Sequence, residues 1–188
     1  MKVKFGLSNV HIAPIISETE ESIQYGDVFA LPGAVNLTLD PEGDTTSFSA
    51  DNNSRYFEED NNDGYAGSLE LALLSNEFRK KIMGQIQDSN GAFLENKNDK
   101  IKKFALGFQI DGDDHNRKYW LYSVSAKRPS TSSQTNEKSK TPSTDTLNIT
   151  ASPRLHDGNV KIDLEPSTEN QTAYDEFFDS VYEKLGSV

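Results

Sequence analysis

The sequence contains no cysteine, so it can form neither disulfides nor thiolate metal sites, and it has no cysteine nucleophile. No apolar run approaches the ~20 residues that a membrane-spanning helix needs. The first residues, MKVKFGLSNVHIAPI, lack the continuous apolar stretch of an export signal. We therefore expect a chain that is neither exported nor inserted into a membrane.

The sequence also lacks the common motifs of catalysis and metal binding. It has no G-x-S-x-G, P-loop or dinucleotide fingerprint. Its histidines, His11, His115 and His156, have no partners at metal-ligand spacing. The stretch DGDDHNRKYWLY differs from a calcium loop, because its sixth residue is not glycine and Tyr122 stands where a bidentate Glu belongs. We expect no enzyme activity, no metal and no cofactor.

Hydrophobic residues are scarce, at 34% of 188 residues, although a chain of this length can bury roughly 70% of its unfolded surface. The apolar residues are concentrated in periodic segments, whereas the connections between them are polar and unusually long. The sequence therefore predicts a single domain, 1–188, with long polar loops at about 40–63 and 129–142.

Acidic residues outnumber basic ones, and the formal net charge is -11. A polyanion is not expected to bind nucleic acid, since binding to phosphates relies on Lys and Arg. The charges are also unevenly placed: residues 40–63 hold eight acids and one base, whereas residues 79–103 hold seven bases and three acids. These segments are either two solvated loops or complementary surfaces that meet between copies of the protein.

Alternation of apolar and polar residues is the dominant pattern, and a period of two is typical of strands with one buried face. In RKYWLYSVSA, the alternation places Trp120, Tyr122 and Val124 on one face. The turn at 111–116 is expected to join two of the strands as a hairpin. The alternating segments are 34–40, 65–74, 103–111, 117–126 and 145–150.

Helical periodicity appears in two short segments. Residues 75–83 predict a helix that Ser75 caps and Gly84 ends, and residues 172–185 repeat apolar side chains at i, i+3, i+4 and i+7. No strand-helix-strand rhythm suggests a parallel sheet. The sequence therefore predicts a mainly β fold, an antiparallel β-sandwich or barrel with one or two short flanking α-helices.

Four motifs, in their order and spacing, indicate a family. They are GYAGSLELALL, FALGF, AKRP followed by a polar insert, and TLNITASPR. Over nearly its whole length the chain resembles the major tail protein of long-tailed, non-contractile bacteriophages, in the group typical of Gram-positive hosts. The resemblance implies a tail-tube-type β-sandwich, with the flanking helix at residues 75–83 and the long loop of the first sheet at 40–63.

The resemblance further implies a structural protein of the virion, made in the cytoplasm of the host bacterium and without catalytic residues. Its copies would form hexameric rings that stack into a tail tube, through which genomic DNA passes without specific binding. The implied partners are other copies of the chain, the tape-measure protein, the tail terminator and the distal tail proteins.

In such an assembly, the two polar loops would act as arms that order on meeting an adjacent subunit. Acids facing the lumen would repel DNA phosphates within a Debye length of roughly 8 Å. The candidate lumen-facing acids, on the polar faces of alternating strands, are Asp40 and Glu70. The candidate residues of the inter-subunit arms are Asp44, Glu58, Glu59, Asp60, Arg128, Lys138 and Lys140.

A function of a different class is a β-sandwich module that binds a ligand or a carbohydrate. Tyr119, Trp120 and Tyr122 would then form a platform on which sugar rings stack. Such a platform must remain exposed in the monomer. The alternation that pairs Trp120 and Tyr122 with Val124 favours instead a strip of the core.

Overall fold

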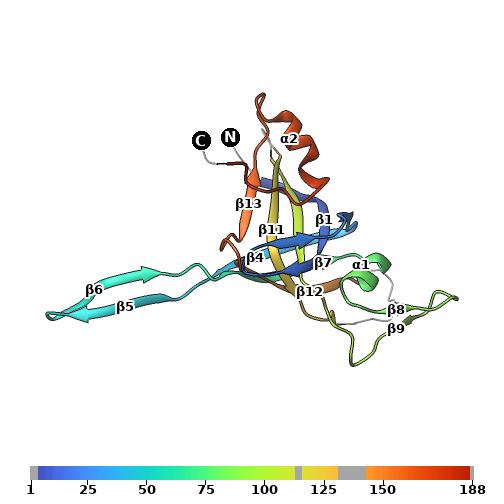
Figure 1. Ribbon diagram of the computed structural model, residues 1–188, viewed down its shortest axis with the longest axis horizontal. Coiled ribbons are helices and arrows are strands. Elements are labelled where there is room, and N and C mark those ends of the chain that lie inside the picture. The colour runs from blue at the N-terminus through green and yellow to red at the C-terminus, as the bar shows by residue number, and fades with distance from the viewer. Residues whose placement is uncertain (1–3, 113–115, 131–142, 187–188) are drawn as a thin grey trace, which may run out of the picture.

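The protein is described by a computed structural model over residues 4–112, 116–130 and 143–186. One large sheet dominates it, with strand order β2-β1-β10-β11-β12-β7-β4, and every strand pair is antiparallel (Figure 1). In addition, β3 pairs with β1 and β13 pairs with β11. These strands are β1 (Lys4–Glu18), β2 (Ile23–Tyr25), β3 (Phe29–Ala30), β4 (Ala34–Glu42), β7 (Gly64–Leu71), β10 (Phe104–Gly112), β11 (Arg117–Ala126), β12 (Asp145–Ser152) and β13 (Lys161–Leu164).

All five alternating segments form strands, which confirms the mainly β prediction. They correspond to β4, β7, β10, β11 and β12, and the hairpin predicted around 111–116 joins β10 to β11. The fifteen-residue strand β1 was not predicted. Its register shifts between Ser8 and His11, where Asn9 has a φ of 50°, so the alternation is interrupted by a bulge.

Strand β11 organises the fold because it belongs to two parts of the sheet. Its first half pairs with β13 and its second half with β12. In the pairing of β11 with β10, the register shifts between Leu121 and Val124. Because of this shift, Val124 lies on the same side of the sheet as Leu121, although the two residues are three positions apart. Val124 therefore does not share a face with Trp120 and Tyr122, and that part of the prediction is wrong.

Two apolar cores lie on opposite sides of β11. The larger includes Leu121 and Val124, and the smaller includes Trp120, Tyr122 and Phe177. Because both faces of β11 are covered, nearly all of its side chains are buried or partly buried. The larger core is completed by the side chains of Val10, Ile12, Leu31, Leu69, Leu71, Phe78, Phe104, Leu106, Leu147 and Ile149, among others.

The C-terminal segment covers the smaller core. It contains α2 (Gln171–Asp175) and the 3-10 turn η1 (Glu176–Phe178), a shorter helix than the periodicity over 172–185 predicts. Here backbone carbonyls accept hydrogen bonds from the sheet. Three side chains at alternate positions of β11 are the donors: Lys118 Nζ to Tyr174 O at 2.6 Å, Trp120 Nε1 to Phe177 O at 2.8 Å, and Tyr122 Oη to Tyr182 O at 2.9 Å.

Helix α1 (Asn76–Lys81) packs against the larger core and agrees with the prediction of a helix at residues 75–83. The Ser75 hydroxyl accepts a hydrogen bond from the backbone N–H of Phe78 at 3.2 Å, as expected of an N-cap. The helix ends before Gly84, whose φ of 73° is easily adopted by glycine. Phe78 is fully buried and anchors the helix to the sheet.

Candidate assembly surfaces

Residues 40–63, predicted as a long polar loop that acts as an arm, contain a β-hairpin. The end of β4 and the start of β7 extend into a hairpin of β5 (Thr45–Ala50) and β6 (Asn53–Asp60), which projects from the body (Figure 1). Its tip is a two-residue turn in which Asp51 and Asn52 have φ angles of 51° and 60°. Two successive residues with positive φ are typical of the type I′ turns that close tight hairpins.

The arm is joined to the sheet by continuous hydrogen bonding. The N–H of Asp63 donates to Glu42 O at 2.9 Å, and the N–H of Asn61 donates to Asp44 O at 3.1 Å. Between these bonds, a Cβ at Gly43 would lie 1.9 Å from the carbonyl oxygen of Asn61. Only glycine permits this approach of the two backbones, so Gly43 shapes the base of the arm.

The arm presents aromatic side chains to solvent. Phe48 lies directly opposite Phe57 in the hairpin, and their exposed fractions are 61% and 50%. Tyr56 is also exposed, at 62%. Glu59 follows Phe57 at the next position on the same face. A paired, exposed set of large aromatic side chains is typical of a surface that contacts another molecule.

The structure places four of the predicted arm residues together on the arm and Arg128 elsewhere. Arg128 lies away from the arm and forms an ion pair with Glu95 at 2.9 Å. Lys138 and Lys140 lie outside the described residues, as does most of the predicted loop at 129–142. The four residues that lie together, exposed on the arm, are Asp44, Glu58, Glu59 and Asp60.

A second surface, the basic end, comprises residues 79–103, which follow the start of α1. It contains a small hairpin of β8 (Ile86–Gln87) and β9 (Phe93–Leu94), in which Ile86 pairs with Leu94. These two side chains are 65% and 61% exposed. The guanidinium of Arg79 stacks on the Phe93 ring, 4.0 Å from its centroid. The lysines at 97, 100 and 102 are exposed beyond the hairpin.

A third surface is the polar face of β4, β7 and β12. It contains both candidate lumen acids: Asp40 is exposed, while Glu70 is partly buried and accepts a hydrogen bond from Thr144 Oγ1 at 2.5 Å. Strand β4 has no strand on its outer side among the described residues. Across the three strands, the rows of paired residues on this face are Asn36–Glu70–Thr146, Thr38–Ser68–Asn148 and Asp40–Ala66–Thr150.

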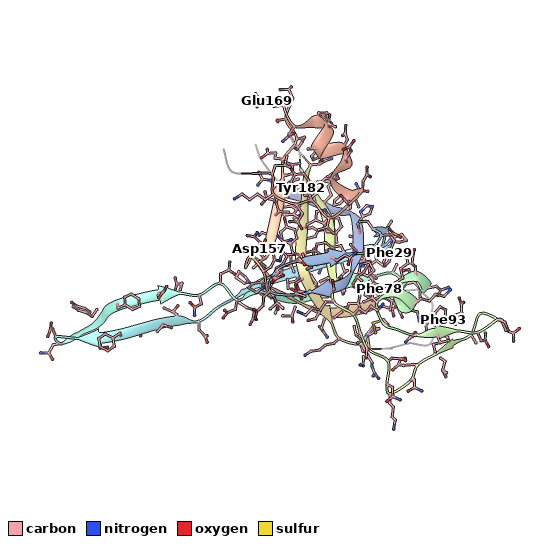
Figure 2. The ribbon with its side chains drawn as sticks, in the orientation of Figure 1. Phe29, Phe78, Phe93, Asp157, Glu169 and Tyr182 are labelled. Carbon is pink, nitrogen blue, oxygen red and sulfur yellow. The ribbon has the colours of Figure 1, made fainter. Side chains whose placement is uncertain are left out.

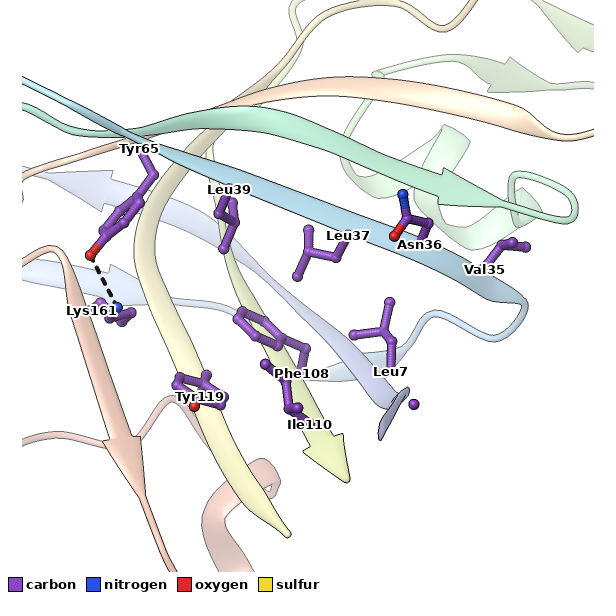
Figure 3. Close-up of a pocket in the computed structure, with 11 residues that line it drawn as sticks. Leu7, Val35, Asn36, Leu37, Leu39, Tyr65, Phe108, Ile110, Tyr119 and Lys161 are labelled. Atoms are coloured by element: carbon purple, nitrogen blue, oxygen red, sulfur yellow. Dashed lines mark hydrogen bonds between the residues drawn. The ribbon is translucent and has the colours of Figure 1, made fainter. Parts of the chain in front are cut away.

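On its opposite face, β4 borders a groove of about 510 Å³ that is lined by both apolar and polar side chains (Figure 3). Leu37 and Leu39 of β4 face Phe108 and Ile110 of β10 across it. At one end, Lys161 Nζ donates a hydrogen bond to Tyr65 Oη at 3.0 Å. The groove lies where β4 approaches β1 without pairing to it, and it opens into the larger core.

The aromatic platform that a carbohydrate-binding module would need is not exposed on the protein. Trp120 is completely buried and Tyr122 is 2% exposed, because the C-terminal segment covers both. Tyr119 alone remains partly exposed, at the groove, where its ring stacks on Phe108 with centroids 5.0 Å apart. Of the three rings, only that of Tyr119 is exposed enough to contact a ligand.

A buried arginine, Arg154, stabilises the C-terminal segment. Arg154 is 1% exposed, lies 3.9 Å from the ring centroid of Tyr122, and pairs with Asp157 and Glu183. Burial would lower the pKa of Arg154, but the hydrogen bonds to the two carboxylates raise it above its ordinary value. Burial likewise raises the pKa of the Tyr122 hydroxyl.

The described part of the chain contains neither a candidate metal site nor a membrane-spanning helix. Across 4–112, 116–130 and 143–186, no three His, Asp or Glu side chains are placed to share a metal ion. Within the same residues, no helix has the length and apolar character required to cross a membrane.

The arm, the basic end and the polar face are the three candidate assembly surfaces of the protein. No protein-family model and no curated protein matches this chain.

Proposed function

We propose that this protein is a tail tube protein of a long-tailed, non-contractile bacteriophage, and that its copies assemble into stacked hexameric rings around a central channel for DNA. The proposal combines the sequence resemblance with the surfaces described above. The observation that carries it is the acidic, aromatic arm, which extends from the sheet beside β4, an edge strand with no strand on its outer side among the described residues.

The edge strand β4 supports assembly into a closed ring. An open edge exposes backbone N–H and C=O groups that invite pairing with another strand. In a ring, each edge can meet the next subunit, and the last subunit closes on the first, so no edge remains open. Glu42 and Gly64 pair at the base of the arm, so a neighbour bound along β4 would also lie beside the arm.

The polar face of β4, β7 and β12 supports the role of a channel lining. Its rows carry hydroxyl, amide and carboxylate groups, with Ala66 the apolar exception. The carboxylates of Asp40 and Glu70 would repel DNA phosphates, while the neutral side chains would offer no cationic grip. A genome could then slide past the wall without adhering to it.

Electron microscopy of the purified, concentrated protein tests the proposal. We expect rings, or tubes built of stacked rings, with six subunits around the axis. Sedimentation at the same concentrations measures the fraction assembled. A protein that remains monomeric and binds glycans would contradict the proposal and support a carbohydrate-binding module instead.

A further inference from the structure

We propose that the arm of one copy docks on the basic end of the next copy, with Phe48 and Phe57 packed against Ile86 and Leu94. This inference rests on the self-assembly proposed above and names the two surfaces that carry it. Both surfaces belong to the same chain, and neither is covered within the described residues.

The two surfaces match in their apolar side chains. Each presents one pair of large hydrophobic residues directly opposite each other in a hairpin, Phe48 with Phe57 and Ile86 with Leu94. All four side chains are at least half exposed in the single subunit. Bringing the pairs together removes four apolar side chains from water, which is the main favourable term in most protein association.

The charges of the two surfaces are complementary. Residues 40–63 carry eight acids against one base, and residues 79–103 carry seven bases against three acids. Glu59 lies on the same face of the arm as the phenylalanine pair, and Lys97 follows Leu94 closely in the chain. Opposite charge around an apolar contact favours this orientation and speeds the encounter, whereas two arms or two basic ends would repel each other.

The shape of the molecule requires that the contact be made between copies. The arm and the β8–β9 hairpin lie at opposite ends of the longest axis (Figure 1), and Phe93 marks the end away from the arm (Figure 2). An arm therefore cannot reach the basic end of its own chain. Because the two surfaces differ, the contact is head-to-tail and repeats from copy to copy, which closes a ring or propagates a chain.

Engineered cysteines test the contact directly, since the natural sequence contains none. The double variant Phe57→Cys with Leu94→Cys, concentrated under mild oxidation, should give a ladder of covalent oligomers on a non-reducing gel. The matched control keeps Phe57→Cys and adds Leu185→Cys, because Leu185 is 76% exposed but lies on neither surface. We expect the control to give at least about tenfold less of the ladder.

Equal ladders from the two double variants, or no ladder from either, would overturn the docking contact. Electron microscopy of the same samples separates this result from the proposed tube. Tubes without the Phe57–Leu94 cross-link would leave the tube standing and reject the contact, whereas cross-linked open chains without rings would support the contact and reject the tube.

Exchange of charges provides an independent test that avoids oxidation. The variants Glu59→Lys and Lys97→Glu should each raise the concentration for half-maximal assembly about tenfold, and a protein with both changes should recover most of the loss. The matched control is Glu169→Lys, because Glu169 is exposed and lies away from both the arm and Phe93 of the basic end (Figure 2). Additive losses in the double variant, or losses equal to that of the control, would contradict the contact.

Discussion

The indole of Trp120 lies against Gly107, the residue directly opposite it on the neighbouring strand β10. A Cβ at position 107 would be 2.9 Å from the ring atoms. The same indole donates its N–H to Phe177 O at 2.8 Å. Glycine ordinarily weakens a strand, but here it makes room for the side chain that holds the C-terminal segment on the sheet.

We expect Gly107→Ala to destabilise the protein by about 1–3 kcal/mol, because the added methyl group would push the buried indole out of its position. Urea unfolding, followed by tryptophan fluorescence, measures the change. Gly186→Ala is the control, since no heavy atom lies within 4 Å of a Cβ built there, and it should shift stability by less than about 0.5 kcal/mol. Equal stability of the two variants would show that the indole can move freely.

Trp120→Phe should loosen the C-terminal segment. The change removes the donor to Phe177 O and leaves that buried carbonyl without its side-chain partner, at a cost of about 1–3 kcal/mol. Hydrogen exchange should rise in residues 171–182 more than in β4 or β7. Tyr56→Phe, on the exposed arm, should leave exchange unchanged. If Trp120→Phe raised hydrogen exchange equally in all parts of the chain, the anchoring role of Trp120 would be contradicted.

The ion pair of Asp157 with Arg154 predicts a loss of stability in acid. Burial would raise the pKa of Asp157, but hydrogen bonds from Arg154 and Asn159, with the charge of Arg154, lower it below its ordinary value. A lowered folded-state pKa gives stability that is present above the unfolded value, near 4, and lost as pH falls through the folded value.

We therefore expect Asp157→Asn to be about 1–3 kcal/mol less stable than the natural protein at pH 7. The difference should shrink as pH falls below about 4. Urea unfolding at pH values from 7 to 2 measures it, with the exposed Glu20→Gln as control. A difference that stays constant over this range would show that the charge of Asp157 contributes nothing.

Removal of the arm should abolish the proposed assembly and leave the body folded. Replacing residues 44–61 by an Asn-Gly turn deletes side chains that are exposed wherever the structure describes them. We expect the thermal unfolding midpoint to change little, while sedimentation shows monomers at concentrations where the natural protein assembles. A shortened protein that still forms tubes would exclude the arm from assembly.

In the proposed tail tube, lysine at the two candidate lumen positions should make the channel bind DNA. Tubes of Asp40→Lys with Glu70→Lys should retain DNA, and the retention should fall steeply as salt is raised, because phosphate contacts release counterions. Filter binding and DNA ejection from assembled particles measure the effect. Glu20→Lys with Glu21→Lys gives the same charge change away from the polar face. Unaltered ejection would show that these acids do not face the genome.

The sequence pattern was informative where a strand buries one face. The alternation in β4, β7 and β12 identified these strands because burial of one face selects apolar residues at every second position. It failed at bulges, which insert residues and reverse the faces, as at Asn9 and between Leu121 and Val124. It also failed in β5 and β6, whose described side chains are all exposed, so that no burial imposes a period.

The candidate surfaces were predicted in part. Charge alone indicated the acidic segment at 40–63 and the basic one at 79–103, because clusters of like charge are visible in any chain. The exposed pairs Phe48–Phe57 and Ile86–Leu94 were not predicted. Sequence does not reveal which residues stand opposite each other across a hairpin, and an isolated phenylalanine in a polar segment gives no sign of its exposure.

By itself, the sequence determined the mainly β composition, the capped helix α1, the absence of thiol chemistry and the two poles of charge, since each depends on neighbouring residues or on residue counts. The tertiary structure alone decided that β11 is buried on both faces, that Trp120 and Tyr122 anchor the C-terminal segment, and that residues 40–63 contain a β-hairpin. These features arise from pairings between distant parts of the chain, such as Trp120 with Phe177, which local periodicity cannot encode.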